Sequence, residues 1–123
     1  SDKVLAFGRV DDAEKMMAPR LQALLDQAEA GAMLDEDAIS ATLGRVLRLA
    51  VATRRDAWLE WIFTFSRAYS YHLPAAMLDE LYTLMFTQRP ALAVGLSIEA
   101  YAQMVSDEKL ILRLVALRRL CRE

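Results

Sequence analysis

Residues that form turns are scarce in this chain of 123 residues, and this scarcity constrains the fold more than any other feature. The sequence contains four Gly, three Pro and no Asn, and it lacks the Asn-Gly, Asp-Gly and Gly-Gly pairs that form tight hairpins. An all-β chain needs a turn about every 8–12 residues. Leu, Ala and Met, which favour helices, number 46, whereas the β-branched Val, Ile and Thr number 16. The sequence therefore predicts an all-α fold.

The length and the cysteine content indicate one reduced domain. A chain of 123 residues suits a single hydrophobic core. Cys121 is the only cysteine, so no intrachain disulfide and no cysteine-based zinc site can form. We expect a single helical domain over residues 1–123, with an N-terminal arm or short helix over residues 1–10. Whether the chain is a fragment of a longer protein stays open.

Charge and hydropathy limit the cellular setting. The net charge is −2, which gives no overall attraction to nucleic acid or to an anionic membrane. No apolar run approaches the ~18–20 residues of a membrane span, and no signal peptide opens the chain. The single thiol then favours a cytoplasmic location. Arg outnumbers Lys by 12 to 3, and Ala and Leu reach 20 each, a composition associated with GC-rich bacterial genomes.

Apolar residues recur with helical spacing along most of the chain. Pro19 lies within the first such pattern, where it either ends a short helix or kinks a longer one. Residues 90–96 form an apolar connector, and Ser97 and Ser106 are expected to cap the two helices that follow. The predicted helices cover residues 12–30, 36–72, 74–89, 97–105 and 107–121. We expect a compact bundle of five to seven helices around a central αα-hairpin over residues 56–88.

Residues 36–72 form either one long helix or two. No Gly or Pro interrupts the chain between Gly44 and Pro74, which favours one helix. Thr53 and Asp56 have the spacing of a capping box, which favours a break near residues 53–55. The alternative for residues 58–65 is a buried strand, but the residues on both sides of this segment have helical spacing. We therefore favour two helices.

No constellation of residues indicates catalysis. His72 is the only histidine, and nothing in the sequence places it beside Cys121. The acidic pairs lie at helix starts, where capping explains them, and no Glu-x-x-His pair or Gly-rich phosphate loop occurs. We expect no enzyme, no cofactor and no metal.

The most distinctive segment is an aromatic cluster, since eight of the ten aromatic residues fall within residues 58–86. On a helical wheel Phe63 lies roughly opposite Trp61, so this helix is apolar on most sides. Such a helix is either central or uses one face for a partner. Trp, Tyr and Met are also favoured at interfaces. The predicted partner-binding residues are Trp58, Trp61, Phe63, Phe65, Tyr69, Met77, Tyr82, Met85 and Phe86.

The hydrophobic fraction of 55% is high for a small monomer, so we expect a protein partner or a homo-oligomer. The leading hypothesis is a non-enzymatic interaction domain, of regulatory or adaptor type, that binds a partner helix or itself. One alternative is a helical nucleic-acid-associated factor that uses a stripe of Arg45, Arg48, Arg54 and Arg55. Another alternative is a structural subunit of a larger assembly.

Overall fold

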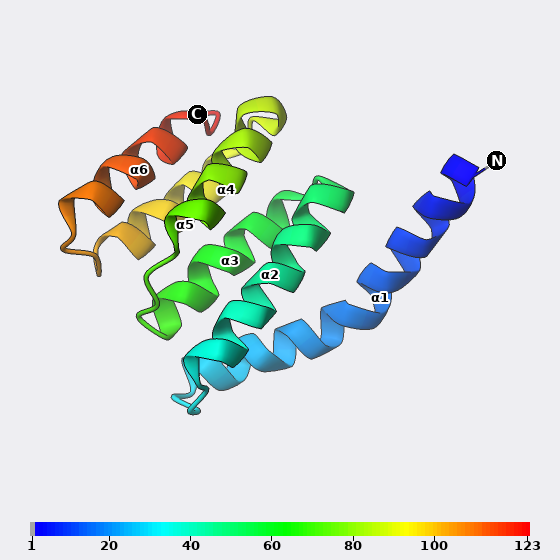
Figure 1. The fold of residues 1–123 in the computed structure, drawn as a ribbon, viewed down its shortest axis with the longest axis horizontal. Helices are drawn as coiled ribbons and strands as arrows, with labels where there is room; N and C mark the ends of the chain where they lie inside the picture. The colour runs from blue at the N-terminus through cyan, green and yellow to red at the C-terminus, as the bar shows by residue number, and fades with distance from the viewer. Residues whose placement is uncertain (1) are drawn as a thin grey trace.

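The computed structural model describes the backbone of residues 2–123 and the side chains of residues 8–123. These residues form helices and no strand, so the all-α prediction is confirmed. The helices are α1 (Asp2–Glu29), α2 (Glu36–Thr53), α3 (Asp56–Ala68), α4 (Ala75–Gln88), α5 (Leu92–Ala102) and α6 (Glu108–Arg119) (Figure 1).

The helices alternate between two layers. One layer contains α2, α4 and α6, which face the viewer in Figure 1, and the other contains α1, α3 and α5. Within the second layer α3 packs against both α1 and α5, and across the layers it packs against α2. The predicted bundle is thus confirmed, but its central element is α3 itself. The consecutive helices α3 and α4, which were expected to form the central hairpin, pack less closely than α3 does against α1, α2 and α5.

The first helix is longer than predicted and it bends. It begins at Asp2, so it also includes residues 2–10 of the expected arm, and it runs through Pro19. Proline lacks an amide hydrogen and its ring crowds the preceding turn, which kinks a helix without always ending it. Figure 1 shows α1 changing direction partway along, with its first half extending away from the other helices.

The predicted break between α2 and α3 is confirmed, but the predicted capping box is wrong. Thr53 is the last residue of α2, and its hydroxyl donates to the Leu49 carbonyl at 2.8 Å. The N-cap of α3 is Arg55, which makes no side-chain capping bond. The chain turns instead at Arg54, which has φ 55° and donates its amide to the Ala50 carbonyl. This left-handed residue closes α2, a role that glycine usually takes.

Two further helix starts differ from the prediction. Helix α5 begins at Leu92 and not at Ser97, so most of the expected connector is helical. A side chain distant in sequence supports this start, because Asp56 accepts the Ala91 amide at 2.8 Å. The N-cap of α6 is Asp107 and not Ser106, and its carboxylate accepts the Lys109 amide at 2.8 Å.

The core lies between the layers and is centred on α3. Phe63 and Phe65 of this helix and Tyr101 of α5 are fully buried. The Tyr101 hydroxyl donates to the Tyr71 carbonyl at 2.7 Å and accepts the Leu73 amide at 2.9 Å, which ties α5 to the connection between α3 and α4. Among the described helices, none combines the length and the apolar character that crossing a bilayer requires.

Candidate protein-interaction site

The structure divides the predicted partner-binding residues between the core and the surface. Five are buried, two are half-buried and two are exposed. The buried ones are Trp58, Trp61, Phe63, Phe65 and Met85, the half-buried ones are Tyr69 and Met77, and the exposed ones are Tyr82 and Phe86. A partner that binds the folded chain can therefore reach only the last four of these side chains.

Both tryptophans hold α3 against α1. The Trp61 indole donates to the Leu21 carbonyl at 3.2 Å and stacks on Phe65, with the ring centroids 4.5 Å apart. The Trp58 indole donates to Glu14 at 2.6 Å. A buried indole N–H needs such a partner. These two contacts give the tryptophans a structural role.

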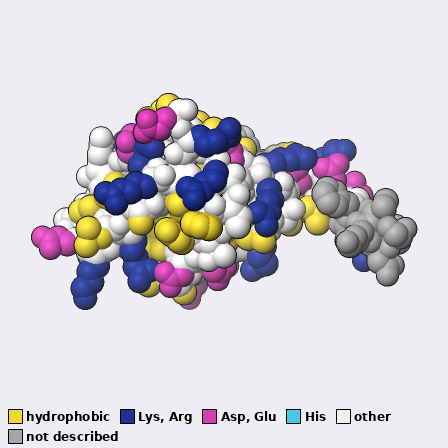
Figure 2. Space-filling model, turned by 90° about the horizontal axis from the view of Figure 1, so that it is seen from above, with side chains coloured by type: hydrophobic (Ala, Val, Ile, Leu, Met, Phe, Trp, Pro, Cys, Tyr) yellow, Lys and Arg dark blue, Asp and Glu magenta, His cyan; other side chains and the backbone are white. Residues whose placement is uncertain are grey.

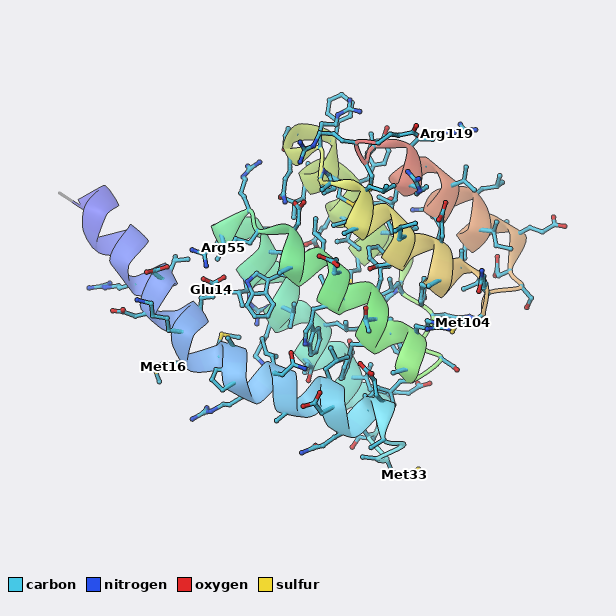
Figure 3. All side chains as sticks on the ribbon, turned by 180° about the vertical axis from the view of Figure 1, so that it is seen from behind. Glu14, Met16, Met33, Arg55, Met104 and Arg119 are labelled. Carbon is cyan, nitrogen blue, oxygen red and sulfur yellow. The ribbon has the colours of Figure 1, made fainter. Side chains whose placement is uncertain are left out.

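Glu14 is a buried carboxylate that the sequence analysis missed. One of its oxygens accepts from Trp58, and the other accepts from Arg55, which also lies 3.4 Å from Asp11. Figure 3 shows Glu14 and Arg55 pointing toward one another from α1 and from the start of α3. A signal was present in the sequence, because Glu14 interrupts the stripe formed by Val10, Met17 and Leu21. An acidic residue on an apolar face is expected to have a buried partner.

The exposed aromatic residues form a small cluster on α4. The Tyr82 and Phe86 rings are stacked with centroids 6.2 Å apart. The Arg89 guanidinium lies over the Phe86 ring, 4.9 Å from its centroid, in a cation–π arrangement. Tyr82 remains 43% exposed and Phe86 52% exposed. Aromatic and arginine side chains in this arrangement are typical of protein interfaces.

A groove of about 480 Å³ separates α2 from α4, and we call it the α2–α4 groove. Tyr82 does not line it, since this side chain lines a hollow on the α6 side of α4. Its lining consists of Val51, Arg54, Asp79, Glu80, Thr83, Leu84 and Thr87. The two helices run in the same direction (Figure 1). Arg54 lies at the end of α2 and donates to Thr87 at 3.0 Å, whereas Asp79 and Glu80 lie in the first half of α4. The groove therefore has an apolar floor with a basic end and an acidic end.

The predicted arginine stripe is not a continuous surface. Arg45 and Arg48 line a separate hollow of about 320 Å³ between α1 and α2. Arg55 is paired with acidic residues of α1, and Arg54 lies on the other side of α2, in the α2–α4 groove.

A different set of cations gathers at one end of the molecule. Helices α2, α4 and α6 all end there, and Arg54 and Arg89 are the C-cap residues of the first two (Figure 1). Arg119 is the last residue of α6, and the Arg122 guanidinium donates to the Arg89 carbonyl at 2.9 Å. Figure 2 shows Lys and Arg side chains spread over this end, with apolar side chains between them. Basic residues at helix C-termini are stabilised by the helix dipoles.

The single histidine and the single cysteine of the chain lie far apart. His72 lies at the edge of a hollow of about 730 Å³, which Tyr69, Tyr71, Glu36 and Met33 also line. Cys121 is buried after α6, near Asp56 at the start of α3, whereas His72 follows the end of α3, and burial raises the pKa of the Cys121 thiol. Among the described side chains, no three His, Cys, Asp or Glu residues converge to hold a metal ion.

Comparison of the chain with protein-family models, with curated proteins and with solved structures finds no significant match in any of the three.

Proposed function

We propose that this protein is a non-enzymatic interaction domain, of adaptor or regulatory type, and that it binds an amphipathic helix of a partner in the α2–α4 groove. The observation that carries the proposal is the apolar gap between two parallel helices on the exposed face of a bundle. A helix laid into such a groove buries its apolar stripe and completes the layer.

The walls of the groove present apolar side chains at helical spacing. Val51 is 48% exposed and faces the groove from α2, while Thr83, Leu84 and Thr87 face it from α4. Spacings of three and four residues place these α4 side chains on one helical face. A partner stripe of Leu and Ala matches this surface.

The charges at the two ends of the groove favour one direction for the partner helix. Arg54 at one end favours acidic residues, and Glu80 at the other end favours basic ones. Glu80 forms no ion pair with a described side chain, whereas Asp79 is already bound to Arg113 at 2.6 Å. Natural helices carry acidic residues in the first turn and basic residues in the last turn. The expected partner helix therefore runs antiparallel to α2 and α4.

Two synthetic peptides of about 16 residues test this proposal. Both carry a Leu/Ala stripe at helical spacing; one has Glu in the first turn and Arg in the last, and the other has these charges exchanged. Titration into the ¹⁵N-labelled protein, followed by amide chemical shifts, is expected to perturb α2 and α4. The peptide with exchanged charges is expected to bind about three- to tenfold more weakly.

Val51→Asp and Val115→Asp form a matched pair of variants. Both residues are exposed valines on helices, 48% and 41% exposed, but Val115 lies on α6, away from the groove. Val51→Asp is expected to weaken peptide binding at least tenfold, and Val115→Asp is expected to leave it unchanged. Binding that survives Val51→Asp, or amide shifts that map to other helices, contradicts the proposal.

A further inference from the structure

We propose that a second copy of this chain binds the outer face of α6, with the two α6 helices antiparallel about a two-fold axis. This inference is independent of the α2–α4 groove, because it rests on a different surface at the end of the bundle. The surface consists of Glu108, Leu112, Val115 and Arg119, and we call it the α6 stripe.

The α6 stripe is an apolar strip on the last helix of the stack. Its members recur at intervals of four, three and four residues, which places them on one face of the helix. Leu112 is 69% exposed and Val115 is 41% exposed, while the opposite face, with Leu110, Leu114 and Leu117, is buried against α4 and α5. Stacked helical layers need a polar outer face at their ends to stay soluble as single chains. This end instead presents two large apolar side chains.

The charges of the α6 stripe match those of its own copy. A two-fold axis that places Leu112 opposite Val115 of the second copy also places Glu108 opposite Arg119, since both pairs are centred between residues 113 and 114. Opposite charges then flank an apolar centre at both ends of the contact. A parallel arrangement would bring Glu108 against Glu108 and Arg119 against Arg119. The register therefore selects an antiparallel, isologous dimer.

Both charged residues of the α6 stripe are available for such a contact. Neither Glu108 nor Arg119 forms an ion pair with another described side chain. The neighbouring Arg118, in contrast, is bound to Glu99 of α5 at 3.1 Å and lies against Gly95. Figure 3 shows Arg119 at the edge of the molecule farthest from α1.

The size of the α6 stripe predicts a weak dimer. Helix α6 has 12 residues and is therefore about 18 Å long. Standard interfaces bury about 800 Å² on each partner, and one short helix pair buries less. Leu92 and Leu96 of the adjacent α5 are also exposed and can enlarge the contact. We expect half-dimerisation at a concentration between ~10 μM and 1 mM.

Sedimentation velocity over a concentration series from about 5 μM to 1 mM tests the dimer without any added ligand. The mass is expected to rise with concentration toward twice the 13.9 kDa of the chain. Leu112→Glu is expected to raise the dissociation constant at least tenfold. Because Leu112 is mostly exposed, this variant is expected to fold normally, which circular dichroism checks.

A charge exchange tests the register. Glu108→Arg and Arg119→Glu are each expected to weaken the dimer about three- to tenfold, because each creates a like-charge contact. The double variant E108R/R119E is expected to restore the affinity to within about twofold. Val51→Asp is the control, since its failure to change the dimer separates this surface from the α2–α4 groove. A monomer at every concentration, an assembly larger than a dimer, a dimer that Leu112→Glu does not weaken, or a double variant without recovery each overturns the proposal.

Discussion

Replacement of Glu14 by alanine tests whether the buried carboxylate holds α1 on the bundle. Glu14 is 5% exposed, and each of its two oxygens accepts a hydrogen bond, one from Trp58 and one from Arg55. Its removal leaves the indole N–H of Trp58 without an acceptor in a site that water does not easily reach. The exposed Asp12 on the same helix, which forms no ion pair with a described side chain, is the matched control.

The magnitude follows from the surroundings of the two donors. An unsatisfied buried donor costs about 1–3 kcal/mol. The Arg55 side chain is 59% exposed, so water replaces its lost partner, and that loss adds at most about 1 kcal/mol. We expect Glu14→Ala to lower the free energy of unfolding by about 2–3 kcal/mol and Glu14→Gln, which keeps an acceptor for Trp58, by about 1 kcal/mol. Asp12→Ala is expected to change it by less than about 0.5 kcal/mol.

Urea denaturation of these variants, alone and combined with Trp58→Phe, measures the effect. Phenylalanine has no N–H, so Glu14→Ala is expected to cost about 1–2 kcal/mol less in the Trp58→Phe background. A Glu14→Ala variant as stable as Asp12→Ala, or an equal cost in both backgrounds, would refute the reasoning.

Two further predictions concern the core. Trp61→Ala removes a buried indole that stacks on a neighbouring ring, and we expect it to cost about 3–5 kcal/mol in urea denaturation; a loss below about 1 kcal/mol would show that the ring is not core. Tyr101→Phe removes a hydroxyl that bonds the Tyr71 carbonyl and the Leu73 amide, and we expect a cost of about 1–3 kcal/mol at pH 7. Burial raises the pKa of Tyr101 above its ordinary value of about 10, so this phenol stabilises the fold fully below about pH 10 and less as pH rises, since the unfolded chain ionises first. The stability gap between the wild type and Tyr101→Phe is therefore expected to narrow above about pH 10 in urea titrations, and a constant gap up to pH 11 would contradict this account.

Local sequence signals located most helices but misplaced several of their ends. The start of α2 follows a local rule, because Asp35, a residue type favoured at N-caps, accepts the Ala38 amide at 2.8 Å. The start of α5 was placed too late, because the Ala91 amide is bonded to Asp56, a residue of another helix. The break near residues 53–55 was predicted, but its closure by Arg54 was not, because an arginine in the left-handed region has no local signature. Rules on capping and periodicity use only neighbouring residues, so they cannot locate helix ends that depend on side chains distant in sequence.

The candidate site, like the helix ends, could be predicted only in part from the sequence. The aromatic cluster was recognised from its composition, but its role depended on what covers α3. Since α1, α2 and α5 all pack against this helix, most of its apolar sides are buried, and only Tyr82 and Phe86 of α4 remain exposed. The α2–α4 groove could not be predicted, because it depends on the separation of two helices that are not adjacent in the chain.

The amino-acid sequence alone determined that this chain forms amphipathic helices, since helix propensity and apolar spacing act over a few neighbouring residues. Only the tertiary structure decided which aromatic side chains are buried, that Glu14 has partners in α3, and that the α2–α4 groove and the α6 stripe are exposed. Burial is a property of packing between segments distant in sequence, and a periodic pattern records that a helix has an apolar face without recording what covers it.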